Sequence, residues 1–406
     1  MTKKLAHALL GGAALLALGA GAASAAEVRV VVATYSPQTK PIFEGMAADF
    51  MAANPGTTVK IEEVAWDNLQ QRLTTDIAGG TAPDIAIIGT RWLVDYVAND
   101  IALPLDACVT PEVKGRFIET FLAPSMIDGK LYGLPVAASA RAMYYNEELL
   151  AKSGVSAPPK TWDELVAAAG KVKAAGAYGF GLQGKEIETD AYWYYSLWTH
   201  GGSLIENGKS GIASPAGIEA ATLYKSMIDK GLTEPDPTAL NRQDVESLFK
   251  QGRAAMILSG PWLRGQIKGE TPNLKYGIAA IPEGSAKATY GVTDSIMIFN
   301  SSKVKDEACK FLTDAAFTTK WRKEFTIKEG FLPVFKEVAA DPAFANDPQL
   351  KAFTDQLPYA KFAPLIPNWE EMADATAAAL QNIYLGKAAP EAALKEAAAR
   401  IDGLLK

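Results

Sequence analysis

The chain has 406 residues, with 40 Lys and Arg against 46 Asp and Glu, two cysteines and two histidines. A chain of this length is typical of two domains. The formal net charge of -6, with no basic run, argues against a nucleic-acid partner and against an anionic membrane surface. Beyond the amino terminus no stretch is apolar for long enough to cross a bilayer, so we expect no direct membrane insertion.

Residues 1–25 have the pattern of a cleavable export signal. Lys3 and Lys4 precede the apolar run Ala8 to Ala20, and Ala23-Ser24-Ala25 is a small-residue cleavage site. No cysteine lies near that site, so no lipid anchor is expected. The sequence therefore predicts a soluble periplasmic protein, and we expect it to act as a monomer.

The few cysteines and histidines limit the kinds of metal site and catalytic site that the chain can form. Cys108 and Cys309 are predicted to be two buried free thiols, although export would permit a single disulfide between them. His200 is the only histidine after the signal, and nothing near it favours a His-ligated metal site or a Ser-His-Asp triad. The glycines of 179–184 match a dinucleotide fingerprint formally, but they lie within a strand instead of opening a helix. We therefore expect no metal and no cofactor.

Strands and helices alternate after the signal. Strands are predicted over Val28–Ala33, Thr58–Val64 and Ile85–Ile88, with one helix after each of the first two. This alternation predicts an α/β fold with an open, mainly parallel sheet whose strand carboxyl ends share one edge. Asp67, after the second strand, is better explained as a helix cap than as a ligand contact. The loops at the shared edge carry the candidate ligand contacts Gln38, Trp66, Thr90, Arg91 and Trp92, of which Trp92 could equally begin a helix that buries it.

Two segments are predicted to cross between two lobes. Gly129–Asn146 carries Ser139 and Arg141, which would face the cleft or make a hydrogen bond in the hinge. Tyr290–Phe299 returns the chain to the first lobe. Its Asp294 lies among apolar residues and needs partners, so it could bind ligand hydroxyls or, as we favour, tie the hinge. These crossings predict a first lobe from residue 26 to 138, a second lobe from 139 to 291, and a return to the first lobe at 292.

The second lobe is predicted to open with a helix capped by Thr161, because Glu164 completes a capping box. Further helices are expected to be capped at Ser214 and Asn241. A dense aromatic helix lies near residues 190–202, and helical spacing there favours core packing for some of the rings. Its first turns carry candidates for either ligand contact or packing, namely Asp190, Tyr192 and Trp193.

Phe249–Gly265 is predicted to run from a helix end through a buried strand into a sharp turn. The strand is Ala254–Leu258, and Ser259-Gly260-Pro261 then turns the chain and places Trp262 at the strand's carboxyl end. Open α/β sheets bind their ligands at that end. The indole would form one wall of a sugar site, or it would pack the loop onto the core. The remaining candidate contacts are Arg264, Gly330, Phe331 and Trp369.

Six segments in the same order together resemble the solute-binding proteins of carbohydrate ABC importers, the group that includes maltose-binding protein. They are G-T-A-P-D-I at 80–85, G-K-L-Y-G-L-P at 129–135, M-Y-Y-N-E-E-L-L at 143–150, T-W-D-E-L at 161–165, F-K-Q-G-R-A-A-M-I-L-S-G-P-W at 249–262 and G-F-L-P-V at 330–334. The resemblance implies two hinged, interleaved α/β lobes, the first made of residues 26–138 and 292–336 and the second of residues 139–291 and 337–406. It also makes Trp262 a sugar-stacking ring. Thr90-Arg91-Trp92 stands where maltose-binding protein has an Asp-Arg pair, which argues against maltose as the ligand.

The resemblance also implies a function. The protein would capture a mono- or oligosaccharide by lobe closure and deliver it to a membrane-embedded ABC permease, and no ATP site is expected in this chain. Arg91, Arg141 and Arg264 leave open an anionic ligand such as a sugar acid, a sulfo-sugar or a phosphorylated polyol. A periplasmic glycosidase is a further alternative, but the carboxylates Asp84, Asp190, Asp294 and Glu370 have no spacing that marks a catalytic pair.

Overall fold

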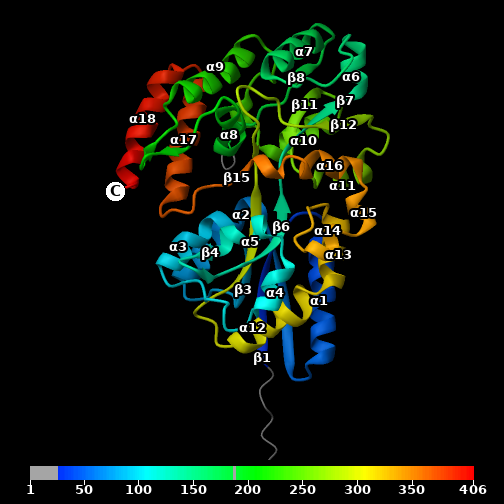
Figure 1. Cartoon of the computed structure of the whole chain (residues 1–406), viewed down its shortest axis with the longest axis vertical. Helices are drawn as coiled ribbons and strands as arrows, with labels where there is room; N and C mark the ends of the chain where they lie inside the picture. Colours follow the sequence, from blue (N-terminus) through cyan, green and yellow to red (C-terminus); the bar gives the residue numbers. More distant parts are fainter. Residues whose placement is uncertain (1–25, 186–188) are drawn as a thin grey trace, which may run out of the picture.

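The computed structural model describes residues 26–185 and 189–406, apart from the side chains of residues 190 and 191. Two sheets, each covered by helices, lie one above the other along the long axis of the molecule (Figure 1). We call the five-stranded sheet with its helices the first lobe and the four-stranded sheet with its helices the second lobe. The fold is therefore a two-lobed α/β fold, as the sequence predicts.

The first lobe is built on a sheet in the order β2-β1-β3-β14-β6, in which every strand except β14 runs in the same direction. Its strands are β1 (Ala26–Thr34), β2 (Thr57–Ala65), β3 (Ile85–Gly89), β6 (Leu134–Ser139) and β14 (Val292–Ile298). The apolar, β-branched β1 pairs in parallel with β2 and β3, which confirms the predicted strands. β14 enters antiparallel between β3 and β6, because it arrives from the other lobe.

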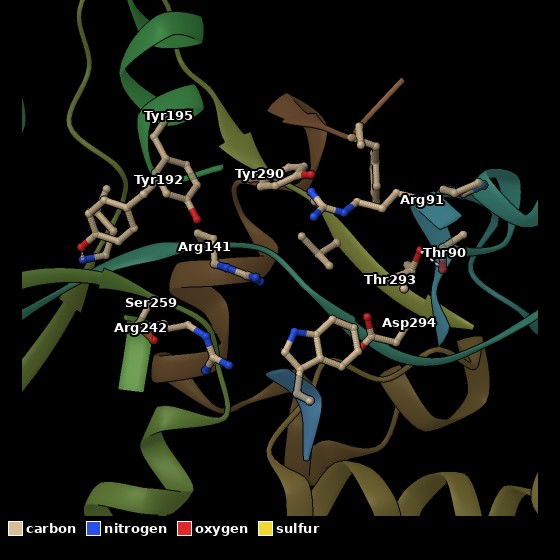
Figure 2. Close-up of a pocket in the computed structure, with 18 of the residues that line it drawn as sticks. Thr90, Arg91, Arg141, Tyr192, Tyr195, Arg242, Ser259, Tyr290, Thr293 and Asp294 are labelled. Atoms are coloured by element: carbon tan, nitrogen blue, oxygen red, sulfur yellow. Dashed lines mark hydrogen bonds between the residues drawn. The ribbon is translucent and has the colours of Figure 1, made fainter. Parts of the chain in front are cut away.

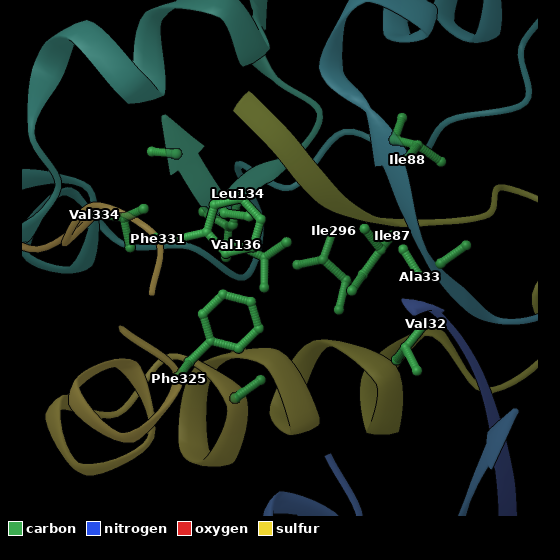
Figure 3. Packing of buried hydrophobic residues seen from close by; sticks show 14 of the residues in the cluster. Val32, Ala33, Ile87, Ile88, Leu134, Val136, Ile296, Phe325, Phe331 and Val334 are labelled. Atoms are coloured by element: carbon green, nitrogen blue, oxygen red, sulfur yellow. The ribbon is translucent and has the colours of Figure 1, made fainter. Parts of the chain in front are cut away.

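Helices cover this sheet and bury its apolar faces. Phe325 of one of them packs beneath Leu134 and Val136 of the sheet, with Phe331 beside it (Figure 3). The helices and short segments of this lobe are α1 (Thr39–Ala53), α2 (Trp66–Ala78), η1 (Thr90–Trp92), α3 (Leu93–Ala98), α4 (Pro111–Arg116), α5 (Glu119–Leu122), η2 (Ala123–Ser125), β4 (Met126–Ile127), β5 (Lys130–Leu131), α12 (Lys305–Lys310), the π-helical η4 (Phe311–Ala316) and α13 (Thr319–Glu329).

The predicted helix cap at Asp67 is wrong. α2 begins at Trp66, one residue before Asp67, and no side-chain hydrogen bond caps it. Asp67 therefore lies in the first turn, where its negative charge still favours the helix amino terminus. Its Oδ2 accepts a long hydrogen bond of 3.5 Å from Nε2 of Gln243 in the second lobe.

The second lobe is built on a sheet in the order β12-β7-β11-β8. Its strands are β7 (Ala142–Asn146), β8 (Tyr178–Phe180), β11 (Ala254–Ser259) and β12 (Tyr276–Ala279). β7 is antiparallel to β11 and β12, since it too arrives from the other lobe. The side chains of Thr161, Ser214 and Asn241 cap the helices that follow them, which confirms three predicted helix starts.

The other elements of the chain lie around this sheet or between the lobes. They are α6 (Glu147–Lys152), α7 (Trp162–Ala174), α8 (Thr189–Thr199), β9 (Ile205–Glu206), β10 (Lys209–Ser210), α9 (Pro215–Asp229), η3 (Pro237–Ala239), α10 (Arg242–Lys250), α11 (Leu263–Glu270), β13 (Thr289–Tyr290), α14 (Lys336–Ala339), α15 (Pro342–Ala345), α16 (Pro348–Thr354), η5 (Leu357–Tyr359), β15 (Ala360–Lys361), α17 (Trp369–Tyr384) and α18 (Pro390–Leu404). Across 26–185 and 189–406, no helix combines the length and apolar composition that a membrane crossing needs.

The two cysteines are joined, so the expectation of two free thiols is wrong. Cys108 and Cys309 form a disulfide with their Cα atoms 6.0 Å apart. Neither side chain is fully buried. The bond links the loop that precedes α4 to α12, two segments of the first lobe that the sequence alone does not bring together.

Candidate ligand-binding cleft

The strand ends of both sheets meet between the lobes. In the first lobe β1, β2 and β3 run parallel, so Tyr35, Trp66 and Thr90 follow strands that end at one edge. β14 runs the other way and places Asp294 opposite Gly89 at the same edge. In the second lobe Arg141 directly precedes β7, whose first residue pairs with Ser259 at the end of β11. Each lobe therefore contributes polar and aromatic side chains to one cleft.

Two adjoining hollows form this cleft. The lining of the first hollow includes Trp66, Thr90, Arg91, Arg141, Tyr192, Tyr195, Arg242, Tyr290, Thr293 and Asp294. The lining of the second hollow includes Tyr35, Trp66, Ser139, Arg141, Arg242, Trp262, Asp294 and Phe331. Their cavity volumes are about 60 Å³ and 180 Å³, so the first hollow has room for only a few water molecules.

The lobes contact each other across this cleft. Nε of Arg91 in η1 lies 2.8 Å from Oε1 of Glu370 in α17, and this ion pair is largely shielded from solvent. Nearby, the backbone N–H of Asn368 donates to Asp95 at 3.1 Å. Together with the contact between Asp67 and Gln243, these bonds link the two lobes across the cleft.

The first-lobe wall of the cleft is a row of aromatic rings. Trp66 is half-buried and lines both hollows. Its ring stacks on buried Trp92 with centroids 5.6 Å apart and planes inclined by 20°, and on Tyr35 at 6.3 Å and 29°. Phe331 meets Tyr35 edge-on at 4.8 Å. Because Trp92 and Tyr35 support Trp66, the ring of Trp66 is held in place beside the cavity.

Asp294 lies at the centre of the cleft and lines both hollows. Its Oδ2 accepts a hydrogen bond of 2.7 Å from the hydroxyl of Tyr35. Desolvation and the charge of Asp294 raise the pKa of Tyr35 well above its ordinary value, so the phenol keeps its proton and donates. This bond ties β14, one of the crossing strands, to the loop after β1.

A chain of buried hydroxyls lies behind this wall. Thr293 donates to Thr90 at 3.0 Å, and the Thr90 and Ser295 hydroxyls lie 2.7 Å apart. Ser295 in turn lies 2.8 Å from the hydroxyl of Ser125. Thr90 and Thr293 line the first hollow, so two members of the chain are placed to turn toward a ligand.

The second-lobe wall contains Trp262, which is only 9% exposed. The guanidinium carbons of Arg141 and Arg242 lie 4.6 Å and 4.9 Å from its ring centroid. Its indole N–H donates to Glu246 at 3.0 Å, and Ser259 donates to the same carboxylate oxygen at 2.6 Å. Trp262 lines the second hollow, and guanidinium groups contact its ring.

Three arginines line the first hollow, and Figure 2 shows Arg91 and Arg141 pointing toward one another across it. Arg91 pairs with Glu370, and Arg242 lies 3.4 Å from Glu246. Arg141 is 5% exposed, and its Nη1 donates to Ser139. Within 26–185 and 189–406, apart from the side chains of 190 and 191, no carboxylate oxygen lies within 4.0 Å of the Arg141 guanidinium.

Tyr192 lines the first hollow, but its hydroxyl is already committed. It donates to the carbonyl of Gly181 and accepts from the backbone N–H of Leu258, both at 2.9 Å. Burial raises its pKa well above the ordinary value, so the group stays neutral. Tyr192 can therefore offer the cavity its ring more readily than its hydroxyl.

Nine of the sixteen predicted site residues line a hollow, and six others lie elsewhere among the described residues. Trp92, Trp193 and Trp369 are buried in the cores. Gln38 is exposed before α1. Arg264 pairs with Asp347 and Gln349. Gly330 ends α13 with a φ of 78° where a Cβ would lie 3.2 Å from Trp262. The side chain of Asp190 falls outside the described residues.

Sequence reasoning missed several residues that line the first hollow, among them Tyr195, Arg242, Tyr290 and Thr293. Arg242 directly follows the predicted cap Asn241, and that helix leads into the strand that ends at Ser259. Tyr290 and Thr293 belong to the predicted crossing, on either side of its turn between strands. The sequence therefore offered one indication for Arg242 and another for Tyr290 and Thr293. Only the packing of the lobes decides that these side chains face the cavity.

The chemistry of the cleft favours binding. It offers aromatic rings, hydroxyls and guanidinium groups, and Asp294 is the only carboxylate among the described residues that line the first hollow. Asp84, proposed as a catalytic carboxylate, instead accepts from the backbone N–H of Arg29 and from Ser302, outside the cleft. The part of the chain that the structure describes contains no group of three or more His, Cys, Asp or Glu arranged to hold a metal.

Known proteins share both the sequence and the fold. Residues 36–320 match the sequence pattern of the bacterial extracellular solute-binding proteins. A binding protein of Brucella abortus is 56% identical over 411 residues, covering 100% of both chains. A maltotriose-binding protein of Pyrococcus abyssi is 27% identical over 82% of this chain and 72% of its own. An ABC transporter solute-binding protein of Thermotoga lettingae, solved with α-D-tagatose, superposes with a TM-score of 0.86 at 24% identity, covering 94% of this chain and 100% of that one. The chain therefore belongs to the bacterial extracellular solute-binding protein family.

Proposed function

We propose that this protein captures a carbohydrate in the interlobe cleft and delivers it to the membrane permease of an ABC transporter. The observation that carries the proposal is the position of Trp66. Its half-buried ring faces a cavity to which both lobes contribute hydrogen-bonding groups. Sugars present apolar C–H faces and a rim of hydroxyls, so a ring for the face and polar groups for the rim are the complementary set. Relatives described as maltotriose- and galactooligosaccharide-binding proteins support the same class of ligand.

Lobe closure would couple binding to delivery. A ligand that contacts Trp66 and Thr90 in the first lobe and Tyr195 in the second makes its full set of contacts only when the lobes are closed. Driving a mostly open population to the closed state requires a preference of roughly 5 kcal/mol for that state. The hinge would be the two crossings, dividing the chain into residues 26–138 with 292–336 and residues 139–291 with 337–406. The closed surface is then what the permease recognises.

The proposed location of the protein depends on its export from the cytoplasm. Residues 1–25 have the sequence of a cleavable signal without a cysteine for lipid attachment, and they lie outside the described residues. We propose that the mature protein works as a monomer in the periplasm, between the outer membrane and its permease.

Capture without conversion is the expected outcome, because relatives of this chain are described as binding proteins. The test is a thermal-shift screen against neutral and acidic mono- and oligosaccharides. A sugar at about 100 times its Kd should add about 2.7 kcal/mol to the free energy of unfolding. Small-angle scattering of the same complex should show a smaller radius of gyration, and mass spectrometry should recover the sugar intact. A sugar that binds without closure, or is cleaved, would contradict the proposal.

A further inference from the structure

We propose that the ligand is an anionic carbohydrate, a sugar bearing one oxyanion group that Arg141 binds directly. This inference rests on the proposed function and specifies its substrate class. The observation behind it is a buried guanidinium that lines both hollows yet lacks a carboxylate neighbour within 4.0 Å among the described residues. A buried charge is costly unless it is paired, and a ligand that brings the missing negative charge removes that cost.

Two of the three carboxylates around Arg141 are already paired with other arginines. Glu370 pairs with Arg91 across the cleft. Glu246 is shared, since it accepts from Ser259 and from the indole of Trp262 and lies beside Arg242. The third, Asp294, accepts from the neutral hydroxyl of Tyr35 and lines both hollows beside Arg141, but its carboxylate lies more than 4.0 Å from the Arg141 guanidinium. The contacts that Arg141 does make, one hydrogen bond to Ser139 and the face of Trp262, orient its guanidinium without cancelling its charge.

The backbone holds this guanidinium at a fixed place in the cleft. The N–H of Arg141 donates to Thr289 Oγ1 at 2.9 Å, and the Thr289 hydroxyl donates back to the carbonyl of Arg141 at 2.7 Å. Nε2 of Gln356 donates to the same carbonyl at 3.2 Å. Arg141 thus sits where the first crossing is tied to the second, so a ligand bound there contacts the hinge region itself.

The geometry places the oxyanion between Arg141 and Arg91, which approach from the second-lobe and first-lobe sides (Figure 2). The sugar ring would then lie toward Trp66, which borders both hollows. Planar carboxylates and tetrahedral sulfonates or phosphates all suit a guanidinium, so the shared chemistry is an oxyanion on a sugar. A neutral sugar could accept hydrogen bonds from Arg141 but would leave its charge buried and uncompensated.

The experiment is a competition between matched sugars. The protein is mixed with equal amounts of glucose and glucuronate, galactose and galacturonate, their disaccharides, a hexose phosphate and a sulfo-hexose. Protein is then recovered by gel filtration, and the retained sugar is identified by mass spectrometry. We expect an acidic sugar to be retained at least about 10-fold over its neutral counterpart, the scale of a hydrogen bond to a charged group. Which acidic sugar is retained distinguishes carboxylate, sulfonate and phosphate.

The variants Arg141→Gln and Arg141→Lys test the residue. Arg141→Gln should reduce the preference for the acidic sugar to within about 3-fold of unity, and Arg141→Lys should keep part of it because the charge remains. Circular dichroism is used to check that each variant is folded. The charge-matched control is Arg400→Gln, because Arg400 is an exposed arginine on α18. Retention of only neutral sugars, or an unchanged preference in folded Arg141→Gln, would overturn the inference and leave the proposed function standing. Retention of no sugar would overturn both.

Discussion

Trp66 is the residue whose removal most directly tests the cleft. Its ring is half-buried, borders both hollows and is supported by Trp92 at 5.6 Å and Tyr35 at 6.3 Å. In Trp66→Ala a bound sugar loses the surface on which its apolar face lies. If that contact buries roughly 100 Å² of apolar surface in total, the loss is about 2.5 kcal/mol. The dissociation constant should therefore rise about 30- to 150-fold.

The assay is isothermal titration calorimetry with the sugar found in the screen. Trp66→Phe keeps a ring on the same supports and should lose less than about 10-fold in affinity. Trp321→Ala is the matched control, since Trp321 is also a half-buried tryptophan of the first lobe, but its indole donates to Asp49 away from the cleft. Its affinity for sugar should be unchanged.

The result that would refute this reasoning is a folded Trp66→Ala protein that binds within about 3-fold of the native affinity. Such a result would mean that the sugar contacts other rings of the cleft, such as Tyr195 or Tyr290, and that Trp66 only covers the core. An equal loss in Trp321→Ala would point to an indirect effect on stability.

Three further predictions concern the hinge, the disulfide and pH. Glu370→Gln removes the ion pair with Arg91, so the sugar-bound protein should be less fully closed, with a larger radius of gyration in small-angle scattering than the native complex; an unchanged radius would show that the pair does not hold the lobes. Reduction of the disulfide frees a loop of 201 residues and should lower the free energy of unfolding by up to about 5 kcal/mol in denaturant titrations, while sugar affinity stays the same because neither cysteine lines a hollow. Burial raises the pKa of Glu234 from 4.5 to about 8, so stability that is complete below pH 4.5 is lost as pH rises through about 8. Glu234→Gln keeps an acceptor for the N–H of Leu182 and should raise the melting temperature at pH 8 but not at pH 4; equal effects at both pH values would contradict the shift.

Much of the local structure follows from the sequence because its causes are local. The strand predicted at Ala254–Leu258 is β11, and the predicted caps Thr161 and Asn241 accept from backbone groups within three residues. Such hydrogen bonds and apolar runs need only near neighbours along the chain. The shared edge of the parallel strands also follows, since crossover handedness fixes it, and it places Trp66 and Thr90 near one another before any coordinates are known.

The sequence does not show which of several chemically similar side chains lines the cavity. Trp66, Trp92 and Trp369 all follow strands or begin helices, yet only Trp66 lines the cavity, because the partners that bury the other two come from distant parts of the chain. The pairing of Cys108 with Cys309 and the burial of Arg141 without a carboxylate beside it have the same origin. The sequence by itself determined the elements, the sheet edge and the family, since these depend on short-range hydrogen bonding and periodicity. Only the tertiary structure decided which rings and charges face the cleft, because that depends on contacts between residues far apart in the chain.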